Sequence, residues 1–213
     1  NGISHDIRTP IARLRFALDL TRNCQTVEAL RQHIQDMDMD LDELDQLIKD
    51  WLFYAGLTST AKQITFDTRV EISSLLMEKT NSFAPMYPNI RVISAIEPLN
   101  VLGNQRLLSR CIENILSNAF KFARNDVSVG AESTKEGIAI TIEDDGPGIA
   151  DASLESIVQP FVKLRSQAPG ESYGLGLAIV KTIVKQHKAE LGAGNSKLGG
   201  ARFTVLFPHR QVH

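Results

Sequence analysis

The chain has 213 residues, of which 43% are hydrophobic and 23% are charged, and its formal net charge is −2. This composition is typical of a globular protein with one large or two modest domains, and the near-neutral charge argues against a dominant nucleic-acid or anionic-membrane surface. No apolar run approaches the roughly 20 residues of a membrane span, and no signal peptide is visible. Cys24 and Cys111 have no metal-ligand spacing and lie in sequence that looks helical. We therefore expect two buried free thiols in a protein of a reducing compartment.

A first helix is predicted at the amino end, because apolar residues recur at spacings of four and three from Ile3 to Leu18. Pro10 falls inside this pattern, where it removes a backbone donor and frees the carbonyl of Asp6 at a cost of about 3 kcal/mol. We therefore expect a weakened helix that can bend beside His5.

A second helix is predicted from Val27 to Ala55, where apolar positions alternate spacings of three and four in a coiled-coil seam. Thr26 is its expected N-cap. The polar stretch TRNCQT separates the two helices, so residues 1–57 should form an antiparallel hairpin. A hairpin cannot bury this seam alone, which predicts a dimeric four-helix bundle. The seam consists of Val27, Leu30, Ile34, Met37, Leu41, Leu44, Ile48, Trp51 and Ala55.

Inside this helix lies the acidic run DMDMDLDELD. A calcium loop would need glycine where Leu41 stands and glutamate where Leu47 stands. Because the heptads continue through the run, we expect a solvated acidic helix face.

Beyond a polar linker at 58–64, strands and helices alternate. Strands are predicted at 91–96, 127–133, 137–144, 189–195 and 201–207, and helices at 104–123 and 174–187. Several strands covered by helices on one face describe a two-layer α/β sandwich.

Two glycine-containing stretches could hold a ligand. EDDGPGI places Asp144, Gly146 and Gly148 directly after a strand, where glycines let backbone approach a ligand and the carboxylate can accept from an amine. A tight turn would use the same residues. GLGLAIVK opens a helix with Gly174 and Gly176, and a helix N-terminus favours anions. The run at 163–173 before it has the composition of a mobile loop.

The third stretch is NILSNAFKF, in which Asn114, Asn118 and Lys121 share one helix face. Two amide oxygens and an ammonium suit a hydrated Mg²⁺ ion with its triphosphate, although three ordinary exposed polar residues would look the same.

These stretches together resemble the sensor histidine kinases of two-component signalling. SHDIRTP resembles the H-box of that family, NILSNAFKF the N-box, DDGPGI the G1 box, QPFVKL the F-box and GLGLAIVK the G2 box. The likeness covers essentially the whole chain in the family's order. It implies a dimerisation and histidine-phosphotransfer hairpin at 1–57 and a catalytic ATP-binding domain of GHKL (Bergerat) type at 65–213.

The resemblance also implies site residues, with ATP and Mg²⁺ as cofactors. Asp144 is expected at the adenine amine, Asn114 and Asn118 at Mg²⁺, and Lys121 on the phosphates. The other expected nucleotide contacts are Phe122, Gly146, Gly148, Gly174, Leu175 and Gly176. The chain departs from the family at Ser172, and at Lys188 and Ala189, where glycines are usual.

His5 is the expected phosphoacceptor and catalytic nucleophile. Imidazole is largely uncharged near neutral pH and so has a lone pair for attack, while Asp6 can hydrogen-bond the other ring nitrogen. Thr9, one turn on, either orients a water for dephosphorylation of the partner or merely precedes Pro10. Selective loss of that dephosphorylation in Thr9→Ala would distinguish these interpretations.

The expected function is ATP-dependent autophosphorylation on His5 and phosphotransfer to an aspartate of a response-regulator receiver domain, with phosphatase activity toward that regulator. We expect a homodimer through residues 1–57, no nucleic-acid partner, and a membrane connection only through an upstream region. The chain would then be the cytoplasmic portion of a bacterial inner-membrane sensor. A GHKL ATPase that drives a clamp is a second hypothesis, but it needs no phosphoacceptor hairpin. A non-catalytic dimeric scaffold is a third, and the intact Asn118, Asp144, Gly174 and Gly176 argue against it.

Overall fold

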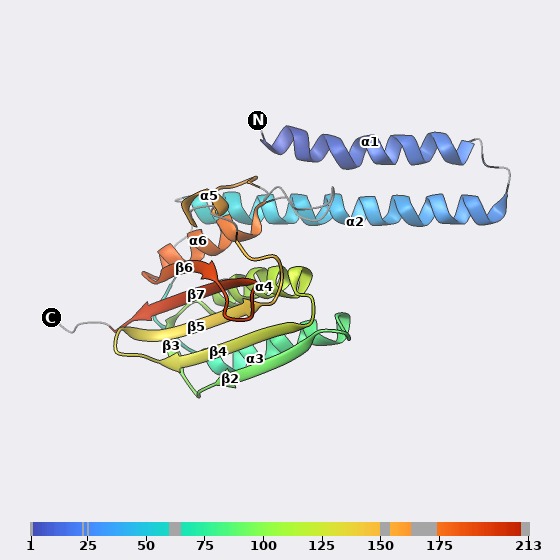
Figure 1. Cartoon of the computed structure of the whole chain (residues 1–213). Helices are drawn as coiled ribbons and strands as arrows, with labels where there is room; N and C mark the ends of the chain where they lie inside the picture. The colour runs from blue at the N-terminus through green and yellow to red at the C-terminus, as the bar shows by residue number, and fades with distance from the viewer. Residues whose placement is uncertain are drawn as a thin grey trace.

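The computed structural model describes residues 2–22, 24, 26–59, 65–149, 154–162 and 174–209, without the side chains of residues 2–6 and 154. The predicted loop at 163–173 and most of the predicted linker therefore lie outside the described residues. Two long antiparallel helices, α1 (Gly2–Arg22) and α2 (Val27–Thr58), precede a domain built on a β-sheet (Figure 1). In this view α1 lies across α2 from the sheet.

The helical hairpin follows the predicted pattern, with two corrections. Thr26 caps α2 by accepting a hydrogen bond from the Ala29 N–H at 3.3 Å, as expected. The acidic run is helical, but Asp40 pairs with Arg13 of α1 at 2.8 Å, so this part of the run faces the other helix rather than solvent. Cys24 lies between the helices and is only half-buried, whereas the prediction placed it buried in a helix. The helix α1 continues through Pro10, which is buried.

The second half contains a five-stranded sheet in the order β2-β4-β5-β7-β6, in which only the β2–β4 pair is parallel among the described strands. The strands are β2 (Arg91–Ile96), β4 (Asp126–Ser133), β5 (Gly137–Asp144), β6 (Glu190–Asn195) and β7 (Ala201–Pro208). All five predicted strands are confirmed to within a residue. Four further elements were not predicted: β1 (Thr68–Glu71), which pairs with β3 (Asn100–Gly103), and the helices α3 (Ile72–Phe83) and α5 (Leu154–Ile157). A 3₁₀ turn spans Ala84–Met86.

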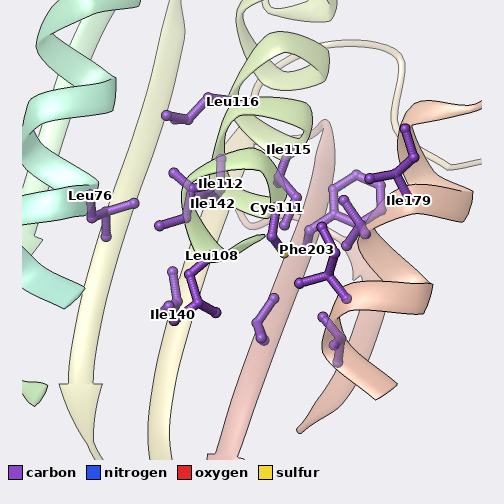
Figure 2. Close-up of a cluster of buried hydrophobic side chains, with 14 of the residues drawn as sticks. Leu76, Leu108, Cys111, Ile112, Ile115, Leu116, Ile140, Ile142, Ile179 and Phe203 are labelled. Carbon is purple, nitrogen blue, oxygen red and sulfur yellow. The ribbon is translucent and has the colours of Figure 1, made fainter. Parts of the chain in front are cut away.

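The helices α3, α4 (Gln105–Phe122) and α6 (Gly176–Gln186) cover one face of this sheet, which confirms the two-layer sandwich (Figure 1). Figure 2 shows α4 side chains meeting those of β5, β7 and α6 in one apolar cluster. Ile115, Ile142 and Ile179 are at most 2% exposed there. Burial of a side chain of this size stabilises a fold by about 1.5–3 kcal/mol. The cluster also contains Cys111, and burial raises the pKa of its thiol to about 12. The packing fixes α4, and with it Asn114 and Asn118.

The hairpin packs directly on the sheet domain through the second half of α2. Leu57 is buried, and its carbonyl accepts a hydrogen bond from Gln186 Nε2 of α6 at 2.9 Å. Asp50 of α2 pairs with Arg110 of α4, whose guanidinium lies 5.7 Å from the centre of the Phe53 ring. Burial raises the pKa of Asp50 although the Arg110 charge opposes that shift.

His187 ties the end of α6 to the start of α4 as a neutral imidazole. Its Nε2 accepts from the Asn104 N–H at 3.0 Å, and its Nδ1 lies 2.8 Å from the Ile183 carbonyl, so Nδ1 carries the proton. The ring also packs edge-on against Phe66 at 4.8 Å between centroids. Burial lowers the pKa of His187 below its ordinary value of 6.5, partly offset by the Ile183 carbonyl.

A pH dependence of stability follows from this arrangement. The unfolded chain binds a proton on His187 more readily than the folded one, so the stabilisation is complete above about pH 6.5 and is lost as the pH falls toward the lower folded pKa. We expect the melting temperature to fall more between about pH 8 and pH 5.5 in the unmodified chain than in His187→Gln. The control His33→Gln on α2 should keep the original dependence. Equal falls in the unmodified chain and His187→Gln would contradict this role.

Candidate functional site

One pocket lies where the end of α4, the end of β5, the start of α6 and the start of β7 meet. Residues from all three predicted stretches line it: Asn118, Phe122, Asp144, Gly148, Gly174 and Gly176. Ile149, Ile157 and Phe203 supply apolar walls. An apolar hollow with a few convergent polar groups is typical of a small-molecule site.

Asp144 is a buried polar residue in the lining of this pocket, with 3% of its surface exposed. Its Oδ1 accepts from the Gly146 N–H at 2.8 Å and from the Ala201 N–H at 3.1 Å. Among the described residues, Oδ2 accepts no hydrogen bond. Burial raises the pKa of Asp144, the two N–H groups oppose this, and the nearby Asp145 charge adds to it. The second carboxylate oxygen is therefore the acceptor that a bound ligand can use.

The three polar residues predicted on α4 lie at different positions relative to the pocket. Asn118 lines it. Asn114 donates from Nδ2 to the Arg110 carbonyl at 2.9 Å, and its Oδ1 would lie 3.3 Å from a Cβ placed on Gly176. This bond orients the amide oxygen of Asn114 toward the N-terminus of α6. Lys121 is not among the lining residues, and its ammonium lies 5.8 Å from the centre of the Phe122 ring.

The start of α6 is shaped by glycine. Gly174 has φ of 67°, and a Cβ there would lie 2.5 Å from the Val162 carbonyl oxygen, so only glycine fits. Leu175 occupies the N-cap position, and within the described part of the chain no side chain caps this helix, so its first N–H groups can bind an anion. The Leu175 side chain is itself 1% exposed within the core, and Leu175 is not among the residues that line the pocket.

Sequence reasoning missed the apolar walls Ile149, Ile157 and Phe203, and it also missed the turn that approaches Asp144. A Cβ on Gly200 would lie 2.2 Å from Asp144 Oδ1, so the β6–β7 turn approaches Asp144 closely only because residue 200 is glycine. Ala201 then donates its N–H to the same oxygen. The dipeptide Gly199–Gly200 before the last strand was the available signal, but on sequence alone it predicts only a turn.

The predicted phosphoacceptor segment lies on α1. His5 and Asp6 belong to its first turns, and their side chains lie outside the described residues. Thr9, one turn further on, is exposed. Within the described ranges, no helix is both long enough and apolar enough to cross a membrane.

Comparison with known proteins identifies both halves of the chain. Residues 103–211 match the family described as "Histidine kinase-, DNA gyrase B-, and HSP90-like ATPase", and residues 1–60 match the "His Kinase A (phospho-acceptor) domain". The sensor protein RstB of Escherichia coli (strain K12) is 30% identical over 98% of this chain and 48% of its own length. The sensor histidine kinase CpxA of the same strain is 31% identical over 98% of this chain and 46% of its own length.

The chain therefore spans about half the length of these curated relatives. A solved structure of the Acinetobacter baumannii histidine kinase AdeS has a TM-score of 0.75 over 97% of this chain and 98% of that chain. At 17% identity this is a likeness of fold. The two family matches and the similarity to sensor proteins along nearly the whole chain show that it belongs to the sensor histidine kinases of two-component signalling.

Proposed function

We propose that the chain is an ATP-dependent protein histidine kinase. It binds ATP in the pocket between α4 and α6, phosphorylates His5, and passes the phosphoryl group to an aspartate of a response-regulator receiver domain. The observation that carries this proposal is the convergence of three separate sequence stretches on one pocket, in a chain whose hairpin contains the H-D-x-x-T-P sequence. The names of its relatives, which include sensor histidine kinases, support it.

The described residues fit ATP. Asp144 Oδ2 is the acceptor for the adenine amine, and Ile149 and Phe203 supply apolar surface for the base. The uncapped N-terminus of α6 suits the phosphates. Asn114 and Asn118 would hold Mg²⁺ through amide oxygens, which are ligands that this ion accepts. When bound, the ion would neutralise charge on the phosphate oxygens.

The transfer itself requires an in-line nucleophile. A ring nitrogen of His5 attacks the γ-phosphorus, the bond from that phosphorus to the bridging β,γ-oxygen breaks, and ADP leaves with the electron pair. Asp6 would accept a hydrogen bond from the other ring nitrogen and so stabilise the positive charge that develops on the imidazole.

Labelled ATP tests this function and separates it from the ATPase alternative. With γ-labelled ATP and Mg²⁺, we expect label on the chain that moves to an added receiver domain with a phosphorylatable aspartate. A receiver in which that aspartate is replaced by alanine is the control and should stay unlabelled. Release of free phosphate without any labelled protein would instead favour a clamp-type ATPase.

We also propose that the chain is a homodimer through residues 1–57. In the single chain most of the predicted seam is exposed: Val27, Ile34 and Leu41 are 60%, 48% and 50% exposed, and Ile48 is 39% exposed. A row of apolar residues along one helix face needs a partner, and a second hairpin offers the same row.

Glutamate at two seam positions should therefore give monomers. Leu41→Glu with Ile48→Glu places charges in a desolvated interface, while each position is open to solvent within one chain, so the fold should persist. Light scattering should report about twice 23.5 kDa for the unmodified chain and for the control Gln35→Glu, and 23.5 kDa for the double variant. A single-chain mass for the unmodified protein at micromolar concentration would contradict the dimer.

We also propose that Thr9 contributes phosphatase activity toward the regulator.

The chain is further proposed to be the cytoplasmic portion of a bacterial inner-membrane sensor. The support is that its relatives are named as sensor proteins and are about twice its length. Membrane fractionation of the full-length protein should recover it with the inner membrane, and recovery in the soluble fraction would contradict this location.

A further inference from the structure

Asp145 joins two walls of the nucleotide pocket, although the predicted pattern assigns it no role. One wall is the end of α4, where Phe122 faces the pocket, and the other is the end of β5, where Asp144 is the last residue. These walls come from segments about 20 residues apart in the sequence. Their spacing must therefore be set by contacts between the two segments.

The carboxylate of Asp145 makes these contacts. Its Oδ1 accepts from the Arg124 N–H at 2.7 Å and the Asn125 N–H at 3.0 Å, just beyond the last turn of α4. Its Oδ2 accepts from the Asn125 N–H at 3.0 Å and from Asn125 Nδ2 at 3.2 Å. The Asp145 N–H donates to the Asp126 carbonyl at 3.2 Å. One side chain thus holds the turn between α4 and β4.

The surroundings of Asp145 favour the ionised form of its carboxylate. Burial alone would raise the pKa of Asp145, but the N–H groups of Asn125, Asp126 and Arg124 and the Asn125 amide lower it to about 2. Hydrogen bonds to an ionised acceptor are shorter and stronger than those between neutral groups.

We propose that Asp145 is a positioning residue of the nucleotide site, which sets the distance between the Phe122 wall and Asp144. This inference rests on the proposed function, since it concerns the binding of nucleotide in that pocket. Asp145 touches no reacting atom. Its loss should therefore weaken binding while leaving the chemical step nearly intact once the site is saturated.

The test compares nucleotide affinity and turnover in substituted chains. We expect Asp145→Ala to raise the Kd for ADP about tenfold by calorimetry, with kcat for autophosphorylation at saturating ATP within about twofold of the original. Asp145→Asn keeps one carbonyl oxygen for the Arg124 and Asn125 N–H groups, so it should recover part of the affinity.

A control separates positioning from general destabilisation. Ser73 is buried on α3, where its hydroxyl accepts from the Leu99 N–H at 2.6 Å, and it does not line the pocket. Ser73→Ala should lower the melting temperature and leave the Kd for ADP unchanged. The inference is overturned if Asp145→Ala binds ADP like the unmodified chain, or if Ser73→Ala loses as much affinity. An unmodified chain that binds no ADP would overturn the proposed function as well.

Discussion

Asparagine in place of Asp144 is expected to weaken ATP binding by about 10- to 100-fold, because a charge-assisted hydrogen bond contributes about 1.5–3 kcal/mol. The substitution changes the bond to the adenine amine and leaves the other hydrogen bonds of residue 144 in place. The asparagine oxygen can continue to accept from the Gly146 and Ala201 N–H groups, so the loop should keep its conformation. Its NH₂ group then replaces Oδ2 and presents a donor to the adenine amine, which is also a donor. Calorimetry with ATP measures the loss.

The same variant should lose selectivity for ATP over GTP, since the guanine ring carries a carbonyl where adenine carries its amine. The isosteric control Asp42→Asn, at an exposed position of α2, should bind ATP like the unmodified chain. Unchanged affinity and unchanged selectivity in Asp144→Asn would mean that the base does not bind beside this carboxylate.

Alanine in place of His5 is expected to abolish autophosphorylation while ATP affinity stays the same. The proposed phosphoacceptor lies on α1, and the pocket is built from α4, β5, α6 and β7, so the substitution removes the proposed nucleophile without touching the binding site. Label from γ-labelled ATP measures the first property and calorimetry measures the second.

A matched control is available on the other helix of the hairpin. His33→Ala removes an imidazole from α2 and should keep full labelling. Persistence of label in His5→Ala would assign the phosphate to another residue, and loss of label in both variants would point to damage of the hairpin.

Much of the fold could be predicted because its elements carry strong local patterns. The β4–β5 hairpin and α4 have clear alternation or helical periodicity, and the structure confirms them. The short strand β1 has only one buried residue, Val70, and its partner β3 begins about 30 residues later. A strand of four residues with one buried position has no readable period, and its pairing depends on distant contacts.

In the site, too, the residues that could be predicted are those whose role follows from their neighbours in the sequence. Asp144 and Gly174 were predicted because a carboxylate after a strand and a glycine before a helix have local chemical meaning. Gly200 and Asp145 were missed because their roles arise from segments that approach only in the folded chain. The structure also bears on Lys188, which stands where the family usually has glycine. Lys188 has φ of 55° after α6, a conformation that glycine adopts without the steric cost of a Cβ.

The most direct test of His5 as phosphoacceptor is the identity of the phosphorylated residue in the unmodified chain. After incubation with ATP and Mg²⁺, peptides prepared near neutral pH would be mapped by mass spectrometry, and the stability of the label in acid and alkali would be measured. We expect one phosphorylated histidine, His5, with label that is lost in acid and retained in alkali. Acid-stable phosphate on a hydroxyl residue, or bound ATP without any phosphorylated histidine, would contradict the assignment of this chain as a histidine kinase.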